Sequence, residues 1–241
     1  MYQNLFLDIK KMKMHVWDDQ KGHLEVPFRK YAYVKDGNGQ HVSLYGDRLK
    51  KVTNYDKDDP TLHESDVPPT TRFLVDNYGD SDEMSVGHRI MFFDIEVEVT
   101  DGFPDVQKAQ NVITSIALYD CITEKYFTYC FDPSKRIESY AKDDEVVEFY
   151  DTEYEMLNKF FQKYLEIRPT IVSGWNSEFF DIPYLYNRAV RVLGPEVANL
   201  LSPISQVLYS EYKKKHTIAG VSSLDYLQLY RQFTFGQKSS Y

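Results

Sequence analysis

The chain has 241 residues, of which 42% are hydrophobic and 27% charged, with 11 glycines and 10 prolines. These proportions are typical of a folded protein with one large or two small domains, and they exclude a low-complexity or disordered chain. The net charge of −9 disfavours a polyanionic partner, because nucleic-acid binding depends on Lys and Arg side chains that displace counterions.

The apolar runs of the sequence are short, with at most four consecutive residues, as in residues 90–93. A membrane-spanning helix needs roughly 20, so we expect no membrane-spanning segment and no membrane partner. The first residues also lack the basic stretch and apolar core of a secretory signal. Two cysteines, Cys121 and Cys130, are too few for a disulfide framework and fit the reducing cytoplasm.

The acidity is concentrated in residues 138–155, which carry eight Asp and Glu residues against one Lys. Without this segment, the rest of residues 89–241 has a net charge of about +1. The negative net charge therefore argues only weakly against a nucleic-acid partner. An acidic run of this kind is typical of a solvated helix face or loop, and we predict that structure for it.

The first third of the chain contains short strand-like pieces separated by turn signals. Residues 28–35 and 41–45 alternate apolar and polar side chains around the Asp-Gly-Asn-Gly sequence of residues 36–39. This arrangement predicts a β-hairpin.

Two further stretches of the first third, residues 54–60 and 62–71, are rich in Asp, Pro and Thr. Such sequences predict loops. Gly and Ser residues then interrupt the pattern within residues 77–88, which indicates a domain boundary. We therefore expect a small β-rich N-terminal domain over residues 1–88.

The pattern changes after this boundary. Residues 89–99, 113–119 and 125–131 each have the composition of a strand, and the short separations between them predict three antiparallel strands.

A helix is predicted next, over residues 153–168, from apolar side chains at helical spacing. Residues 170–173 predict a short strand, residues 174–180 a loop, and residues 182–193 a second amphipathic helix closed by a Gly-Pro pair. The order β-β-β-α-β-α predicts an α/β domain with a mixed sheet.

Two acids lie two positions apart in the first of these strands, at Asp94 and Glu96. Successive side chains of a strand alternate between faces, so both carboxylates point to one face while Phe93 and Ile95 point to the other. Like charges side by side are unfavourable unless a cation neutralises them, and Mg²⁺ or Mn²⁺ prefers such oxygen ligands. The pattern indicates either a metal site or an edge strand whose acids face water.

A second candidate site is the segment of residues 174–185, where Asp181 comes directly before an Ile-Pro pair at the start of a predicted helix. An acid in this position is either a functional ligand or a capping or first-turn residue favoured by the helix dipole. Taken alone, Trp175 and Asn176 would be a core aromatic and a turn residue.

The two segments carry a joint signature. The first reads Phe93-Asp94-Ile95-Glu96, and the second runs from Gly174-Trp175-Asn176 to Phe180-Asp181-Ile182-Pro183-Tyr184. In this order and separation they resemble the first two exonuclease motifs of family B DNA polymerases. Within that family, the replicative polymerases of T4-like bacteriophages share three further segments, Asp101-Gly102-Phe103-Pro104, Tyr186-Asn187-Arg188 and Ser223-Leu224-Asp225-Tyr226. The resemblance covers residues 89–241 closely and residues 1–88 loosely.

The resemblance implies that residues 89–241 form a ribonuclease H-like exonuclease domain, a mixed sheet with flanking helices that is incomplete at its C-terminal end. Such a domain proofreads by two-metal-ion hydrolysis at the 3′ end of single-stranded DNA. It implies that Asp94 bridges two Mg²⁺ or Mn²⁺ ions, that Glu96 binds one ion and orients the attacking water, and that Asp181 holds the second ion. These three residues are the expected catalytic and metal-binding residues.

The resemblance also implies contacts to the DNA strand. Asn176 matches the polar residue of the second motif, which holds the substrate near its end. Phe103 matches an aromatic residue on which the terminal base stacks. Phe180 of the second motif is a further candidate DNA contact.

Residues 205–222 predict a β-hairpin with a basic tip, which in relatives helps to part primer from template. Its lysines, Lys213, Lys214 and Lys215, either contact phosphates or form a solvated tip. After the hairpin, one predicted helical face is expected to be core, and it carries Leu224, Leu227, Tyr230 and Phe233.

The third exonuclease motif of the family, Tyr-x-x-x-Asp downstream of the second, is missing from the sequence. The acids after Asp181 are Glu196, Glu211 and Asp225, and Val221 stands four positions before Asp225. We therefore expect one part of a longer polymerase, inactive or weakly active alone, whose remainder forms palm, fingers and thumb. Implied partners are primer–template DNA and a sliding clamp, and the implied location is the cytoplasm, that of the host cell if a phage encodes the protein.

Two other functions remain open. The missing motif and the β-rich first domain, which in relatives can bind RNA, also fit a non-catalytic module that binds single-stranded nucleic acid or docks the rest of a split polymerase. A stand-alone nuclease that takes its last ligand from another chain is the third possibility.

Overall fold

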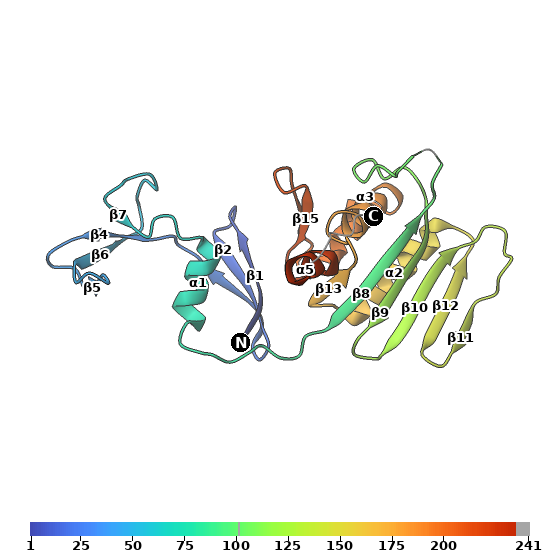
Figure 1. Ribbon diagram of the computed structural model, residues 1–241, viewed down its shortest axis with the longest axis horizontal. Helices are drawn as coiled ribbons and strands as arrows, with labels where there is room; N and C mark the ends of the chain where they lie inside the picture. Colours follow the sequence, from blue (N-terminus) through green and yellow to red (C-terminus); the bar gives the residue numbers. More distant parts are fainter. Residues whose placement is uncertain (101, 235–241) are drawn as a thin grey trace. The chain divides into compact units, whose positions relative to one another are not determined.

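The structure is a computed structural model that describes residues 1–100 and 102–234. The chain divides into two compact units, Met1–Val86 and Gly87–Tyr241 (Figure 1). Each unit has its own hydrophobic core. None of the described helices is both long enough and apolar enough to cross a membrane.

The first unit contains two small antiparallel sheets and a helix. One sheet joins β1 (Tyr2–Asp8), β2 (Lys13–Asp18) and β3 (Gly22–Pro27). The other has the order β5-β6-β4-β7 and consists of β4 (Ala32–Lys35), β5 (His41–Val42), β6 (Arg48–Val52) and β7 (Leu62–His63). On helix α1 (Pro69–Tyr78), Phe73 shares a buried cluster with Met14 and Val16 of β2.

The predicted hairpin between residues 28–35 and 41–45 is wrong, because β6 lies between β4 and β5. Lys35 of β4 and His41 of β5 are both opposite Leu49 of β6. The chain turns back after β5, where Ser43 N–H donates to the carbonyl of Asp47 at 2.9 Å and the intervening glycine supplies a φ of 85°. This second turn closes the hairpin β5–β6 in place of the predicted one.

Helix α1 begins within a predicted loop. The Pro68–Pro69 pair indicates a helix break, but Pro69 lies in the first turn of α1, where a proline removes no helical hydrogen bond. In the same predicted loop, Leu62 and His63 pair with β4 as strand β7. The first unit therefore contains an α-helix in addition to the β-strands that the sequence predicts.

The second unit is built on a seven-stranded mixed sheet with the order β11-β12-β10-β9-β8-β13-β16. The three predicted antiparallel strands are confirmed as β8 (Ile90–Val97), β9 (Ile113–Asp120) and β10 (Lys125–Phe131). Strands β12 (Glu145–Tyr150), β13 (Ile171–Gly174) and β16 (Ser222–Asp225) run parallel to β10, β8 and β13, and β11 (Tyr140–Lys142) pairs with β12. The predicted α/β class is confirmed.

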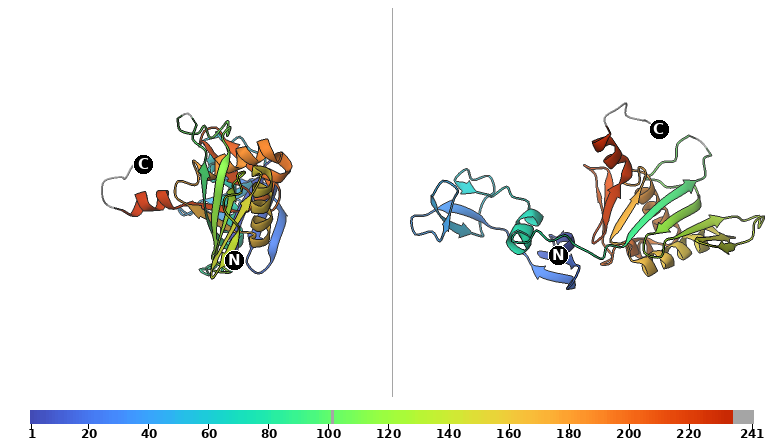
Figure 2. Two further views of the ribbon diagram at one scale, coloured as in Figure 1. Left: turned by 90° about the vertical axis from the view of Figure 1, so that its right-hand side faces the viewer. Right: turned by 60° about the horizontal axis from the view of Figure 1, so that its bottom comes forward.

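The two predicted amphipathic helices are confirmed as α2 (Glu153–Ile167) and α3 (Asp181–Val192), and both lie alongside the sheet (Figure 2). The α2 helix is capped by Thr152, whose hydroxyl accepts the N–H of Glu155. Phe160 of α2 and Leu185 of α3 share one buried core with Phe93 of β8. The remaining elements are α4 (Pro195–Ala198), the 3₁₀ turn Asn199–Leu201, the predicted hairpin β14 (Val207–Ser210) with β15 (Lys215–Ile218), and α5 (Tyr226–Phe233).

The acidic segment of residues 138–155 is only partly the predicted solvated helix face or loop, because it also contains strands. It forms β11, β12 and the first turn of α2, because Val146 and Val147 pair with β10 and give the segment a half-buried strand. Glu153 is buried and forms an ion pair with Arg188. The prediction that the acids are solvated is correct for most of them, and it is wrong for Glu153, because a count of charges does not show which acid has a buried partner.

The predicted helical face after the hairpin is only partly correct. Leu224 lies on β16, since residues Ser222–Asp225 pair with β13. Of the other three side chains, Leu227 is buried, whereas Tyr230 and Phe233 are exposed on α5. The strand pairing of β16 overrides the helical spacing at Leu224.

Candidate active site

Asp94 and Glu96 lie on β8, an interior strand between β9 and β13. The interpretation of the two acids as members of an edge strand is therefore wrong. The alternation is as predicted, with Phe93 and Ile95 buried in the core and both acids on the exposed face. Both carboxylates thus project from the face of the sheet that points away from this core.

Asp181 is the first residue of α3 and lies beside the same strand. Its Oδ1 atom accepts a hydrogen bond of 3.1 Å from the backbone N–H of Ile95, and the residue is 2% exposed. This N–H is available because the pairing of β13 with β8 ends at Phe92. Asp181 therefore continues the hydrogen bonding along β8, between the positions of Asp94 and Glu96.

Gly174 ends β13 at the point where the chain leaves the sheet toward α3. A Cβ atom at this position would lie 2.6 Å from the carbonyl oxygen of Phe93, which is closer than van der Waals contact. The close approach of β13 to β8 therefore requires a glycine here. This approach is what brings the turn of residues 175–180, and then Asp181, to β8.

The electrostatics of the site follow from this geometry. Burial raises the pKa of Asp181 to about 7, and the charge of Asp94 adds to the shift, while the N–H of Ile95 opposes it. Desolvation also raises the pKa of Asp94. Two carboxylates in this situation favour the uptake of a proton or a cation.

The donor set of the site consists of carboxylate oxygens. Asp94, Glu96 and Asp181 offer the hard oxygen ligands that Mg²⁺ and Mn²⁺ prefer, and burial raises the pKa of Asp94 and of Asp181. Among residues 1–100 and 102–234, no group of three His, Cys, Asp or Glu side chains is arranged for a metal. The chemistry of the donors fits a divalent cation, although three of them are not gathered around one point.

Asp225 is a residue of this site to which the sequence assigned no function. It is buried at the end of β16, beside the end of β13. Its Oδ1 accepts the N–H groups of Asn176 at 3.0 Å and Leu227 at 2.9 Å, and its Oδ2 accepts that of Glu178 at 3.2 Å. Asp225 thus caps α5 and fixes the turn that leads to Asp181. An Asp before a helix is a capping signal in the sequence, but the contact with the turn has no local signal.

Three candidate DNA contacts lie near the acids. The Phe103 side chain is 79% exposed, and its ring centroid lies 5.2 Å from that of Phe180, with 53° between the rings. Asn176 has a left-handed backbone, with a φ of 62°, in the turn between β13 and α3. The structure thus brings Phe103 and Phe180 together directly ahead of Asp181.

The three lysines lie on the hairpin β14–β15, at its tip and at the start of β15. The Lys214 ammonium is 3.2 Å from the carboxylate of Glu211, and that of Lys215 is 3.0 Å from Glu178. The second of these pairs ties the hairpin to the turn before α3. Lys214 and Lys215 therefore already have acidic partners, and Lys213 is exposed to solvent.

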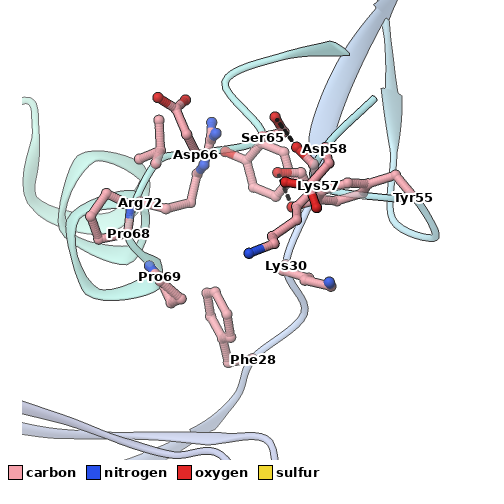
Figure 3. A pocket seen from close by; sticks show the side chains of 12 residues that line it. Phe28, Lys30, Tyr55, Lys57, Asp58, Ser65, Asp66, Pro68, Pro69 and Arg72 are labelled. Carbon is pink, nitrogen blue, oxygen red and sulfur yellow. Dashed lines mark hydrogen bonds between the residues drawn. The ribbon is translucent and has the colours of Figure 1, made fainter. Parts of the chain in front are cut away.

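A separate pocket of about 450 Å³ lies within the first unit (Figure 3). Aromatic and basic side chains line it, but the chain's own cations cover its rings. Lys30 lies 4.9 Å from the ring centroid of Tyr55, and the Arg72 guanidinium lies 4.2 Å from that of Tyr31. The predicted catalytic acids are all in the second unit, which therefore holds the candidate active site.

Comparison with known proteins shows which protein family the second unit matches. The family model for the exonuclease domain of family B DNA polymerases matches residues 78–241. The DNA-directed DNA polymerase of Escherichia phage RB69 is 32% identical over 182 residues, which cover 64% of this chain and 20% of that protein. That of Enterobacteria phage T4 is 32% identical over 174 residues, covering 61% and 19%. DNA polymerase 1 of Saccharolobus solfataricus is 32% identical over 145 residues, covering 55% and 16%.

The chain spans about a fifth of the length of the two phage relatives. The matched region contains both segments that carry the motif resemblance, from Asp94 to Asp181. The resemblance is thereby confirmed, and so is the expected fold class of the second unit. The chain belongs to the family B DNA polymerases, through their exonuclease domain.

Proposed function

We propose that the second unit carries a proofreading site that hydrolyses phosphodiester bonds at the 3′ end of single-stranded DNA. Asp94, Glu96 and Asp181 are its catalytic and metal-binding residues. The observation that carries the proposal is the hydrogen bond from the Ile95 N–H to Asp181, because it joins the acid of the second segment to the strand that bears the other two.

Each acid has its own role in this proposal. Asp94 and Asp181 hold divalent cations, since their carboxylates lie beside the same stretch of β8 and neither forms an ion pair with a cation among the residues that the structure describes. The chemistry that two such cations supply is stabilisation of the attacking and leaving oxygens during in-line displacement at phosphorus. Glu96 projects from the same face of β8, where its carboxylate helps to hold a cation and orients the attacking water.

The end of the DNA strand is held by side chains around the acids. The exposed ring of Phe103 offers a stacking surface for the terminal base, an interaction worth roughly 1–3 kcal/mol that tolerates any sequence. Asn176 and Phe180 flank the same approach to Asp181. Lys213 is exposed on the hairpin and contacts a backbone phosphate.

The names of the two phage relatives support a larger enzyme. Both are DNA-directed DNA polymerases, so we propose that this chain is part of a polymerase that also extends primer–template DNA. In that enzyme the palm, fingers and thumb are supplied outside these 241 residues, and the exonuclease removes misincorporated nucleotides. The enzyme acts in the cytoplasm, that of the host cell if a phage encodes it.

Trimming of a 5′-labelled single-stranded oligonucleotide tests the proposal. This chain, and a chain extended at its C-terminal end, are incubated with Mg²⁺ or Mn²⁺, and we expect the extended chain to shorten the strand from its 3′ end. Asp94→Ala should abolish trimming. Asp144→Ala, at an exposed acid between β11 and β12, should leave it unchanged. Trimming by Asp94→Ala at the rate of the unmodified chain would refute the assignment.

A non-catalytic module is the second candidate function. The carboxylate of Asp225 accepts three backbone N–H groups, so it is not available as a further metal ligand. The residues that the structure describes also contain no cluster of three metal ligands. Both observations favour a module without catalytic activity. Under this alternative the 241-residue chain binds an oligonucleotide in Mn²⁺ and leaves it intact, also after mixing with the downstream part of the polymerase. Restored trimming in the mixture would instead indicate a nuclease that takes its last ligand from another chain.

A further inference from the structure

One face of α3 holds the segment of chain that precedes β9. Tyr184 and Asn187 are three residues apart, so their side chains share that face. The Tyr184 hydroxyl donates to the carbonyl of Asn111 at 2.8 Å, and the Asn187 amide donates to the carbonyl of Val106 at 2.9 Å. Two points of the segment are therefore fixed to the helix through backbone carbonyls.

Arg188 fixes the same segment more firmly. Its Nη1 donates to the carbonyls of Ala109 and Gln110 at 3.2 and 2.7 Å. The rest of its guanidinium forms a buried pair with Glu153 of α2, and the Glu153 carboxylate also accepts the N–H of Ile113 at 2.9 Å. Glu153 of α2 therefore holds the end of the segment, at the start of β9. The side chains of α3 hold the rest of it.

The segment held in this way carries Phe103. Residues 102–112 contain neither helix nor strand, and the exposed Phe103 side chain has little burial of its own to hold it. The ring contacts that of Phe180, which directly precedes Asp181. The position of Phe103 therefore depends on α3, the helix that begins with Asp181.

We propose that Asn187 and Arg188 are positioning residues that hold Phe103 beside Asp181. Through Phe103 they determine how the site binds the unpaired nucleobase at the 3′ end of a DNA strand. The inference rests on the proposed function and adds two residues that touch neither the DNA nor a cation. A base stacked on Phe103 is then held through contacts with α3, the helix that begins with Asp181. The terminal phosphodiester bond is thereby kept at a fixed place relative to the acids.

Binding of a single-stranded oligonucleotide with 2-aminopurine at its 3′ end tests this role in the 241-residue protein. Stacking quenches this fluorescent base, so the signal reports the contact of the terminal base separately from the affinity of the whole strand. EDTA keeps the strand intact during the titration. The variants are Phe103→Ala, Asn187→Ala, the double variant and a control, Asn158→Ala, which removes a similar amide-to-carbonyl hydrogen bond within α2.

We expect Phe103→Ala to weaken binding about 10-fold and to remove the quenching. Asn187→Ala should weaken binding about 3-fold, because Phe103 is displaced rather than absent, and should remove most of the quenching. The double variant should bind no more weakly than Phe103→Ala, since both changes act through one ring. Asn158→Ala should leave both readouts unchanged.

Three results would count against the inference. Native quenching in Asn187→Ala, together with its loss in Phe103→Ala, would overturn the inference and leave the proposed function intact. Additive losses in the double variant would overturn it as well. Failure of the unmodified chain to bind the oligonucleotide would overturn the inference, whereas the proposed function is decided separately by trimming with the extended chain.

Arg188→Lys provides a second variant, which keeps the positive charge but loses the planar guanidinium group and its several N–H donors. We expect it also to lose quenching while its far-UV circular dichroism stays native. Native quenching in a folded Arg188→Lys chain would contradict the assignment of Arg188 as a positioning residue.

Discussion

The carboxylate of Asp181 accepts the backbone N–H of Ile95 at 3.1 Å, and Ile95 is the residue between Asp94 and Glu96. The contact exists because β13 stops pairing with β8 after Phe92, which leaves the edge of β8 open to a side chain. It fixes the start of α3 relative to β8. Asp181, which is far along the sequence from Asp94 and Glu96, is thereby brought to the strand that carries them, where the charge of Asp94 beside it favours a cation.

Replacing Asp181 by Asn should raise the free energy of unfolding at pH 8 in metal-free buffer by roughly 1–3 kcal/mol. The pKa of Asp181 in the folded chain is about 7, above the ordinary value of about 4, so protonation stabilises the folded state. This contribution is fully present below pH ~4 and is lost as the pH rises to 7. The Asn oxygen keeps the bond from the Ile95 N–H without the buried charge.

Urea unfolding at pH 5 and pH 8 measures this difference. The unmodified chain should be the less stable at both pH values, and the gap between the two chains should be smaller at pH 5 than at pH 8. Mg²⁺ or Mn²⁺ should then stabilise the unmodified chain at pH 8 and have little effect on Asp181→Asn. Equal stability at pH 8 would mean that the charge of Asp181 is already neutralised within the chain.

Gly174→Ala should destabilise the second unit by about 1–3 kcal/mol, because its Cβ would press on the carbonyl oxygen of Phe93 at 2.6 Å. Either β13 or the turn before α3 must move, so trimming by an extended chain should fall as well. Gly37→Ala is the control, since no atom lies within 4 Å of its added Cβ. Urea unfolding followed by circular dichroism compares the two, and equal stabilities would show that β13 can shift without cost.

Much of the second unit follows from hydrophobic periodicity. The alternation of β8 and the helical spacing of α2 and α3 could be predicted because each element buries one face. The contact of Asp181 with Ile95 could not, since it joins residues 86 positions apart. The sequence around either residue contains no signal for a contact with the other. Only the joint resemblance to known motifs placed both segments in one site.

Prediction from short stretches of sequence failed where two structural signals compete in the same stretch. In the first unit, two turn sequences follow each other within residues 36–47, and the second one closes the hairpin. Pro69 indicates a break and instead begins α1. The contacts of Asp225 with Asn176 and Glu178 depend on the parallel pairing of β16 with β13, a relationship that composition and spacing do not contain.

Glu153→Gln should destabilise the second unit by about 2–4 kcal/mol, because it leaves the Arg188 guanidinium buried beside a neutral partner. Asp151→Asn is the control: its pair with Lys135 is exposed, and its loss should cost less than about 0.5 kcal/mol. The free energies of unfolding in urea measure both. A small loss in Glu153→Gln would show that solvent reaches Arg188.

Asp225→Asn separates two roles for this acid. The Asn oxygen still accepts the N–H groups that Oδ1 accepts now, from Asn176 and Leu227, while the amide faces the N–H of Glu178 with a donor. If Asp225 acts by fixing the turn, stability should fall by about 1 kcal/mol. Stabilisation by Mn²⁺ should largely persist, because the charge of Asp225 is used by backbone donors.

Asp94→Asn is the matched comparison for Asp225→Asn, since it also replaces one carboxylate by an amide. It should lose most of the Mn²⁺ stabilisation, measured as the shift in melting temperature between metal-free and Mn²⁺ buffers. Equal losses in the two variants would instead make Asp225 a cation ligand. That outcome would require the Asp225 carboxylate to leave the N–H groups of Asn176 and Glu178, and the turn before Asp181 would then have to rearrange when the cation binds.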